Sequence, residues 1–207
     1  MESDSLDKPI NAEQKIKEAA KTIFYRKGFV ATRTRDIAEE AGLNLALINY
    51  YFRSKAKLFE IIMVETFTGF VNKMAVILND ETTSFEEKTA LIALKYIDFI
   101  IQEPEIPLFI FTEIRNNPQG LPKKLPIKDI VNHSVFVKQF QEAVEKGEMS
   151  EPNPLHFLMN LMGLVVFPFI AKPLIMGSKD LKITEFNSLM LERKKSIPIW
   201  IKAMFSS

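Results

Sequence analysis

"TRDIAEEAGLNLALINYYFRSK", residues 34–55, is the stretch that restricts the fold most strongly. A charged segment ends at Gly42, an apolar segment follows, and two adjacent tyrosines and a lysine close it. Ile37 and Ala38 precede the glycine at helical spacing, and Ile48 follows it by six residues. Gly42 can take the positive φ of a tight turn, and the small Ala38 lets two helices cross closely. The pattern predicts a helix-turn-helix over about residues 33–52.

The second helix of this motif, expected over residues 45–52, carries side chains that a buried helix would not need. Leu45, Ala46, Asn49 and Tyr50 share its outward face. Such a helix can lie in the major groove of DNA with its first turns on base edges. Asn49 can pair with adenine, and Leu45 or Ala46 can contact a thymine methyl group. A partly exposed Leu45 without any such role is an equal alternative.

Three further side chains are suited to phosphate oxygens. Tyr50 and Tyr51 carry hydroxyl groups on rigid rings. Lys55 lies in the first turn of the next helix, where its ammonium and free backbone N–H groups can act on one phosphate. Tyr51 can instead belong mostly to the core, and Lys55 can be an ordinary surface lysine.

The charge distribution also favours a polyanion. The whole chain has a net charge of only +1, but the segment from Lys21 to Lys57 holds eight bases and three acids, a balance of +5. A local basic patch on a near-neutral chain is typical of a nucleic-acid site. A solvated charged surface explains the same residues without any function.

Composition and periodicity predict an all-α fold. Hydrophobic residues make up 47% of the 207 residues, glycines number only seven, and no segment alternates with period two. The expected helices cover residues 11–27, 34–41, 45–52, 55–78, 85–102, 108–116, 127–146, 154–176 and 184–205.

Several classes of protein are disfavoured. There is no cysteine, so disulfides and thiolate metal sites are excluded, and His133 and His156 lack metal-ligand spacing. No enzyme motif or phosphate-binding loop is present, so we expect no catalytic residues, metal or cofactor. The N-terminus does not resemble a signal peptide. Residues 155–171 carry no formal charge, yet a buried helix explains them better than a membrane span. We therefore expect a cytoplasmic protein with no membrane partner.

The segment "KIKEAAKTIFYRKGFVATRTRDIAEEAGLNLALINYYFRSKAKLFEII" resembles the DNA-binding domain of the TetR/AcrR family of bacterial transcriptional repressors. The resemblance covers about residues 11–67 and implies an all-helical homodimer with a DNA-binding head and a variable helical body. Two departures stand out. The family often has tyrosine where Asn49 stands, and Thr or Ser where Arg33 stands, so Thr32 or Thr34 must cap the helix or Arg33 exchanges capping for a phosphate contact. The candidate DNA-binding residues are Thr32, Arg33, Thr34, Arg35, Asn44, Leu45, Ala46, Asn49, Tyr50, Tyr51 and Lys55.

The resemblance also divides the chain. We expect a flexible arm at residues 1–10, the helix-turn-helix domain at 11–56 and a helical ligand-binding and dimerisation domain at 57–207. In such regulators the body encloses a pocket for an apolar or amphipathic small molecule. Phenylalanines and methionines at helical spacing are candidates, although core packing is the better explanation for most of them. The pocket candidates are Phe67, Phe70, Phe99, Phe109, Phe111, Phe136, Phe140, Met159 and Met162.

Self-association is expected through the last two long helices of the body, which would form a four-helix interface. The interface candidates are Leu161, Gly163, Leu164, Val165, Phe169, Ile183, Leu189, Ile197, Ile199 and Trp200. A dimer places two recognition helices about 34–36 Å apart, which predicts a pseudo-palindromic operator in double-stranded DNA. The sequence favours a ligand-released repressor. An activator of the same family, or a helical ligand-binding protein or enzyme with an incidental helix-turn-helix, are the alternatives.

Overall fold

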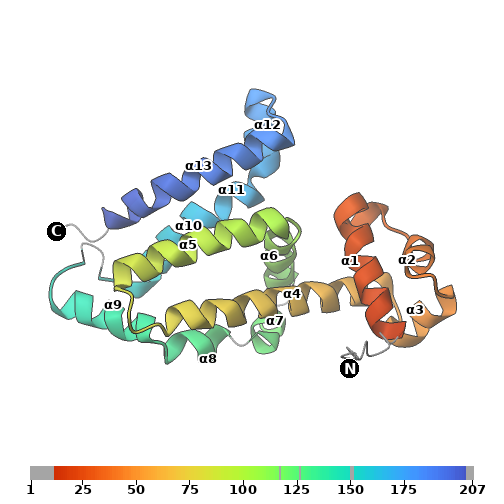
Figure 1. Ribbon diagram of the computed structural model, residues 1–207, viewed down its shortest axis with the longest axis horizontal. Coiled ribbons are helices and arrows are strands. Elements are labelled where there is room, and N and C mark those ends of the chain that lie inside the picture. The colour runs from red at the N-terminus through yellow and green to blue at the C-terminus, as the bar shows by residue number, and fades with distance from the viewer. Residues whose placement is uncertain (1–11, 117, 126, 150–151, 204–207) are drawn as a thin grey trace, which may run out of the picture. The chain divides into compact units, whose positions relative to one another are not determined.

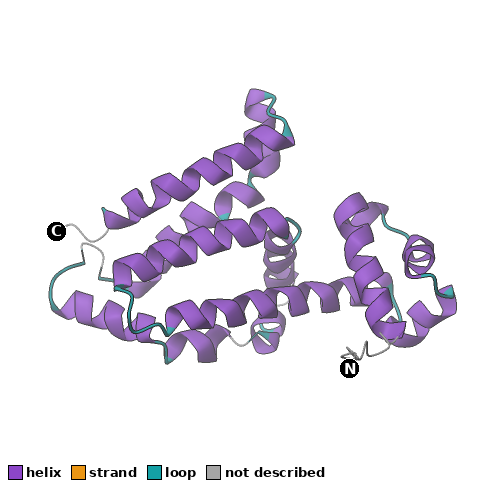
Figure 2. Cartoon of the chain, viewed as in Figure 1, coloured by secondary structure: helices purple, strands orange, loops and turns teal. Residues whose placement is uncertain are grey.

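The computed structural model describes residues 12–116, 118–125, 127–149 and 152–203. Within these residues the protein is entirely helical, with thirteen helices and no strand (Figure 1; Figure 2). The predicted all-α fold is thus confirmed. The predicted flexible arm, residues 1–10, lies outside the described residues. The chain divides into two compact units, residues 1–66 and 67–207.

The first unit contains three helices and the beginning of a fourth. They are α1 (Ala12–Ala31), α2 (Thr34–Ala41), α3 (Leu45–Phe52) and the first half of α4 (Lys55–Leu78). Gly28 interrupts the helical backbone of α1 with φ 74° and ψ 163°. Apolar side chains from all four helices meet in one core, whose most deeply buried members are Ile16, Ala20, Ile23, Phe24, Ile37, Ile48, Leu58 and Met63.

The second unit contains the rest of α4 and nine further helices. These are α5 (Phe85–Gln102), α6 (Ile106–Asn116), α7 (Gly120–Lys124), α8 (Ile127–Asn132), α9 (Val135–Glu145), α10 (Pro154–Val165), α11 (Phe167–Ile170), α12 (Lys172–Lys179) and α13 (Ile183–Lys202). Helix α13 packs along α5. Their shared core also takes side chains from α9 and α10, and its most deeply buried residues are Ala93, Ile97, Ile100, Val165, Phe186, Ile197 and Ile201.

Two predicted helices of this unit are broken. The helix expected over 127–146 is interrupted before α9, because Ser134 acts as an N-cap whose Oγ accepts a hydrogen bond from the Val137 N–H at 3.4 Å. The helix expected over 154–176 is divided into α10, α11 and α12. Pro168 and Pro173 lie in the first turns of the two later pieces, where proline is tolerated. By contrast, α13 continues through Pro198.

One helix in the described part of the chain, α4, is long and apolar enough to cross a membrane by length and composition alone. The most apolar 18-residue stretch of α4 is 39% buried within the protein. A core helix of a soluble protein satisfies the same criterion, so this single helix is weak evidence for a span.

Candidate functional site

The turn between α2 and α3 has the geometry of a helix-turn-helix. Gly42 adopts the left-handed conformation with φ 63° and ψ 33°. The Leu43 N–H donates to the Ala38 carbonyl at 3.0 Å, which closes the end of α2. Asn44 then caps α3, since its Oδ1 accepts from the Ala46 N–H at 2.8 Å. The predicted turn residue, Gly42, is confirmed.

Helix α3 has a buried face and an exposed face. Ile48 and Phe52 are buried in the core of the first unit, whereas Ala46, Asn49 and Tyr50 are exposed, and Tyr50 keeps 78% of its surface. An exposed helix that carries amide and phenol groups is suited to a groove of DNA.

The remaining α3 candidates lie close to this exposed face. Tyr51 is 41% exposed, and its ring meets that of Tyr50 edge to face with centroids 5.1 Å apart. Leu45 is half-buried, and Asn44 is exposed although its side-chain oxygen is used as a cap. The structure therefore brings these candidates together on one end of the first unit.

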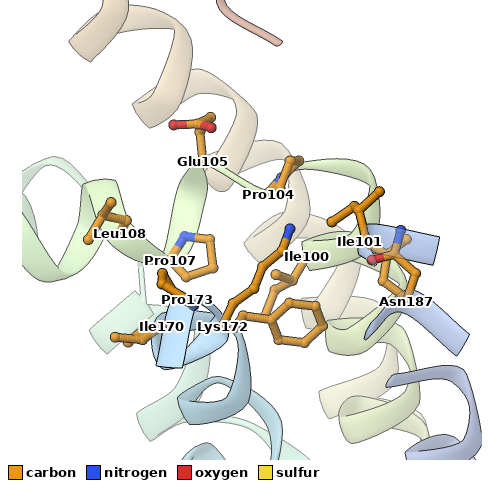
Figure 3. A pocket seen from close by; sticks show the side chains of 12 residues that line it. Ile100, Ile101, Pro104, Glu105, Pro107, Leu108, Ile170, Lys172, Pro173 and Asn187 are labelled. Atoms are coloured by element: carbon orange, nitrogen blue, oxygen red, sulfur yellow. The ribbon is translucent and has the colours of Figure 1, made fainter. Parts of the chain in front are cut away.

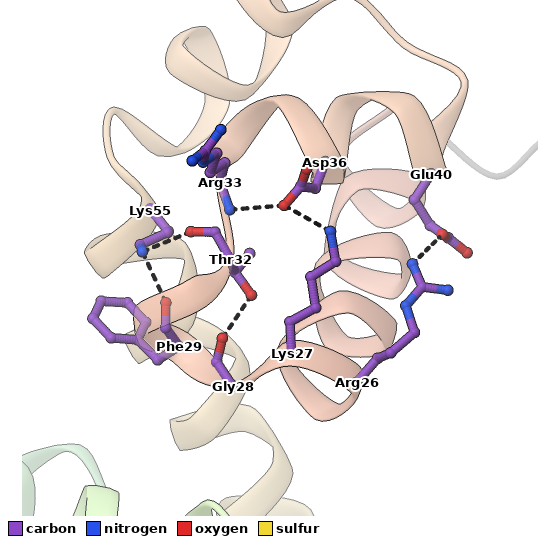
Figure 4. Close-up of polar contacts among 9 residues, drawn as sticks. All are labelled: Arg26, Lys27, Gly28, Phe29, Thr32, Arg33, Asp36, Glu40 and Lys55. Carbon is purple, nitrogen blue, oxygen red and sulfur yellow. Dashed lines mark hydrogen bonds and ion pairs between the residues drawn. The ribbon is translucent and has the colours of Figure 1, made fainter.

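The start of α2 lacks a side-chain cap. Arg33 occupies the N-cap position and offers no acceptor for the free N–H groups of the first turn. Asp36 accepts from the Arg33 N–H at 3.1 Å and forms an ion pair with Lys27 at 3.1 Å (Figure 4). The Arg33 N–H, followed by Lys27, holds the pKa of the Asp36 carboxyl below its usual value. Thr34 is half-buried and Arg35 is exposed in the same turn.

Thr32 and Lys55 are placed differently from what the sequence predicts. Thr32 is 1% exposed, and its hydroxyl donates to the Gly28 carbonyl at 2.7 Å. The Lys55 ammonium donates to the carbonyls of Phe29 and Thr32, each at 2.8 Å, and lies 4.4 Å from the centre of the Phe29 ring (Figure 4). Thr32 thus stabilises the segment between α1 and α2, which removes it from the candidate contacts. Lys55 joins that segment to α4. These two bonds use two of the three N–H donors of its ammonium group, so one donor remains for another acceptor.

Many of the local cations are already paired. Arg26 pairs with Glu40 at 3.1 Å, Lys27 with Asp36, and Lys57 with Glu60 at 2.9 Å. Among the described residues of the first unit, the guanidinium groups that have no ion-pair or hydrogen-bond partner are those of Arg33, Arg35 and Arg53. All three are exposed and belong to the helix-turn-helix or its last residue. A planar group with five donors is well suited to phosphate.

Arg53 is not among the residues that sequence analysis proposes. It ends α3 with φ 64° and ψ −37°, and its N–H donates to the Asn49 carbonyl at 3.0 Å. A positive φ is unfavourable for any residue with a β-carbon, and glycine usually occupies such a helix end. The sequence signal was the abrupt end of an apolar helix at Phe52 with no glycine after it.

The predicted pocket residues fall into three groups. The ring of Phe70 stacks on those of Phe67 and Phe99, with 4.0 Å between the centroids of Phe70 and Phe99. Tyr96 joins them, and burial raises its pKa to about 12. Phe109 is likewise buried. These rings fill space, as the core-packing alternative holds.

Other pocket candidates lie elsewhere. Phe136 and Phe140 line an open recess of about 730 Å³ among α8, α9 and α10. Met162 is half-buried beside the core of the second unit. Phe111 and Met159 are 52% and 61% exposed, so they lie on the surface, and neither lines this recess.

The predicted interface residues also divide. Leu161, Val165 and Ile197 are buried within the core of their own unit, so they are unavailable to a second subunit. Phe169 and Ile183 line a second recess, of about 370 Å³. The predicted residues that remain at least partly accessible are Gly163, Leu164, Leu189, Ile199 and Trp200.

A metal centre finds no support in the described part of the chain. No group of three or more His, Cys, Asp or Glu side chains lies close enough there to hold an ion.

Comparison with known proteins agrees with this geometry. The family described as "Bacterial regulatory proteins, tetR family" matches residues 16–62. The probable HTH-type transcriptional regulator YttP of Bacillus subtilis (strain 168) is 26% identical over 206 residues, 95% of each chain. Several further relatives are named as transcriptional repressors.

Two solved structures share the fold. A TetR/AcrR family regulator from Thermobifida fusca YX-ER1 aligns with a TM-score of 0.66 and 17% identity, over 90% of this chain and 96% of that chain. FadR from Bacillus subtilis, in complex with stearoyl-CoA, aligns with a TM-score of 0.57 and 18% identity, over 87% and 95% of the two chains.

A helix-turn-helix with an exposed second helix, followed by a larger helical unit, defines an all-helical transcriptional regulator. Such a protein acts by binding and is not an enzyme. Residues 16–62 match the DNA-binding domain of the tetR family, and the chain has the fold of TetR/AcrR transcriptional regulators.

Proposed function

We propose that the protein is a cytoplasmic, dimeric repressor that binds a pseudo-palindromic operator and is released from it by an apolar or amphipathic small molecule. The observation that carries this proposal is the exposed face of α3, with Asn49 and Tyr50 open to solvent beside three unpaired arginines. The repressor assignment is supported by the relatives that are named as repressors.

The DNA contacts follow from exposure and chemistry. Leu45, Ala46 and Asn49 are the proposed base contacts, since they begin and extend the exposed face of α3. Polar or cationic groups around them are the proposed phosphate contacts. These are Arg33, Thr34, Arg35, Asn44, Tyr50, Tyr51, Arg53 and the remaining N–H donor of Lys55.

The test measures how tightly the full chain binds DNA from upstream of its own gene. Binding is detected by fluorescence anisotropy at a series of salt concentrations. Arg35→Ala should weaken binding to all sequences and reduce the slope of log affinity against log salt by about 1. Asn49→Ala should instead relax the preference at one base position by about 1–3 kcal/mol. Arg115→Ala, an exposed arginine of α6, is the matched control and should change neither quantity. A chain indifferent to every duplex at low salt would refute the proposal.

Dimerisation is proposed through α10 and α13. Exposed apolar side chains include Met159 on α10 and Ile199 and Trp200 on α13. Arg193 links the two helices, because its Nη2 donates to the Leu164 carbonyl at 2.7 Å while its guanidinium lies 5.0 Å from the Trp200 ring centre. Uncovered apolar area of this kind is typical of an interaction surface.

Sedimentation of the wild type and of Ile199→Glu tests this interface. The charge should convert a dimer into a monomer and weaken operator binding, because two linked half-sites become one. Val76→Glu, at an exposed position of α4, is the control and should leave the dimer intact. A wild-type monomer would contradict this part of the proposal.

The effector is proposed to bind the second unit and to favour one packing of its helices. FadR, a protein of the same fold, holds stearoyl-CoA, which supports an amphipathic ligand class. A coupling of about 1–3 kcal/mol between the two sites would change DNA affinity by about 5–150-fold.

A further inference from the structure

The 370 Å³ recess of the second unit combines an apolar lining with polar groups. It lies among the end of α5, the start of α6, and helices α11, α12 and α13 (Figure 3). Nine of its twelve lining residues are apolar, and the other three are Glu105, Lys172 and Asn187. A cavity of this size with few polar groups is typical of a small-molecule site.

The Lys172 ammonium points into the middle of this recess (Figure 3). No described residue accepts a hydrogen bond from it or forms an ion pair with it, and its Nζ lies 5.3 Å from the centre of the Phe186 ring. Lys172 is half-buried, so water only partly solvates this charge. A cation held among apolar groups with no oxygen acceptor is stabilised strongly by an incoming anion.

The other two polar residues are compatible with that role. Asn187, on α13, lies on another wall of the recess, and its side-chain amide has no hydrogen-bond partner among the described residues. Glu105 lies at the rim with its carboxylate directed away from the Lys172 ammonium, and the two form no ion pair (Figure 3). The recess therefore offers one free cation and one free amide donor.

The rest of the lining suits a hydrocarbon body. Ile100 and Ile101 of α5 and Phe169 and Ile170 of α11 provide aliphatic and aromatic surface beside the ammonium. The larger recess among α8, α9 and α10 differs, because Glu145 is the only charged residue among its described lining residues. Of the two recesses, only the smaller one has a described cation in its lining that can pair with an anion.

We infer that the 370 Å³ recess is the effector site and that the effector is an amphipathic carboxylate, whose head accepts hydrogen bonds from Lys172 and Asn187 while its apolar body lies on α5 and α11. The word effector rests on the proposed function, since it requires that the ligand changes DNA affinity. The binding chemistry itself depends only on the recess.

Calorimetric titration of the full chain with three eight-carbon probes tests the binding chemistry. Octanoate carries the proposed head group, 1-octanol is neutral, and octylammonium has the opposite charge. Octanoate should bind about tenfold to a hundredfold more tightly than 1-octanol, which is the contribution expected of a hydrogen bond to a charged group. Octylammonium should bind most weakly. Equal binding of octanoate and 1-octanol would overturn the inference.

Variants locate the site. Lys172→Met keeps the length and apolar stem of the side chain and should lose the octanoate preference by the same factor, whereas Lys172→Arg should retain it. Lys179→Met removes an exposed lysine of the same helix, outside the recess, and should behave as the wild type. Undiminished octanoate binding by Lys172→Met would place the ligand elsewhere and overturn the inference.

The regulatory role is tested separately, by measuring operator affinity with and without octanoate. Wild type should release DNA in octanoate, and Lys172→Met should not. DNA binding that ignores a bound octanoate would overturn the effector assignment while leaving the DNA-binding function in place. A chain that binds octanoate through Lys172 but binds no DNA would refute the proposed function and support the recess chemistry.

Discussion

Two helices of this protein, one in each unit, begin in different ways. Helix α5 begins with a complete capping box, in which the Glu87 N–H donates to Ser84 Oγ at 3.2 Å and the Ser84 N–H donates to the Glu87 carboxylate at 2.9 Å. Helix α2 has only half of that arrangement. Asp36 accepts from the Arg33 N–H at 3.1 Å, but Arg33 returns no bond.

This difference between the two helix starts shows that the helix-turn-helix has less local stabilisation at its helix ends than α5 has. A serine or threonine at the N-cap stabilises a helix by about 0.5–2 kcal/mol, and α2 has an arginine there instead. Arg53 ends α3 in a left-handed conformation that glycine would adopt without strain. Both positions carry exposed, unpaired guanidinium groups. Locally unfavourable choices of this kind concentrate where function requires them.

The largest expected effect comes from Lys55, the candidate whose side chain is used inside the protein. Lys55→Met should destabilise the chain by about 2–3 kcal/mol, because the Phe29 and Thr32 carbonyls each lose a charged donor. Lys57→Met, in the same turn but exposed and paired only with Glu60, should cost less than about 1 kcal/mol. Urea unfolding followed by circular dichroism measures both. Equal losses of stability in the two variants would show that the bonds of Lys55 to the Phe29 and Thr32 carbonyls do not stabilise the fold.

Completing the capping box of α2 is the second way to sharpen the comparison. Arg33→Ser should stabilise the chain by about 0.5–2 kcal/mol in the same unfolding experiment. It should also weaken DNA binding and reduce the salt slope by about 1. Ser84→Ala in α5 should destabilise by a similar amount and leave the salt slope unchanged. If Arg33→Ser gained stability and lost no DNA affinity, Arg33 would make no phosphate contact that explains the missing cap.

Arg53 offers a smaller effect of the same sign. Arg53→Gly should stabilise the chain by up to about 1 kcal/mol, because the release of left-handed strain exceeds the entropy that glycine loses on folding. DNA affinity should fall in parallel. Gly69→Arg, at an exposed helical position of α4, is the control and should leave DNA affinity nearly unchanged. Destabilisation by Arg53→Gly would show that the arginine side chain supports the turn.

The smallest effect is a dependence on pH. The folded-state pKa of Asp36 lies below its ordinary value of 3.8, so its contribution to stability is complete above that pH. The contribution is lost as the pH falls through the lowered folded value. Asp36→Asn, which cannot ionise, should flatten the fall in unfolding free energy between pH 5 and pH 2. Glu87→Gln should do the same for the box of α5, since the Ser84 N–H and hydroxyl lower the pKa of Glu87. If Asp36→Asn had the same pH profile as the wild type, protonation of Asp36 would not contribute to the loss of stability at low pH.

Sequence reasoning succeeded where structure is local. The bounds predicted for α2, α3, α4 and α5 agree with the structure, because each helix has a clear apolar stripe and most have a cap or a glycine at an end. It failed where several weak signals competed. Ser134 reads equally well as a mid-helix serine or an N-cap, and only packing selects the cap.

The candidate sites also differ in whether local sequence or long-range packing determines them. The exposed face of α3 follows from helical periodicity, so Asn49 and Tyr50 were identifiable from the sequence. The bonds of Lys55 to residues 29 and 32, and the recess around Lys172, depend on which distant segments meet. Periodicity carries no information on which distant segments meet, so the phenylalanines of the sequence could not show which residues line a recess.

The division between the two units falls inside α4, between Thr66 and Phe67, and not in a loop. One helix thus supplies Leu58 and Met63 to one core and Phe67 and Phe70 to the other. Each unit therefore needs its own part of α4 to complete its core. A chimaera that exchanges the two units has to be joined inside this helix, because a cut at either end of α4 would remove apolar side chains from one of the two cores.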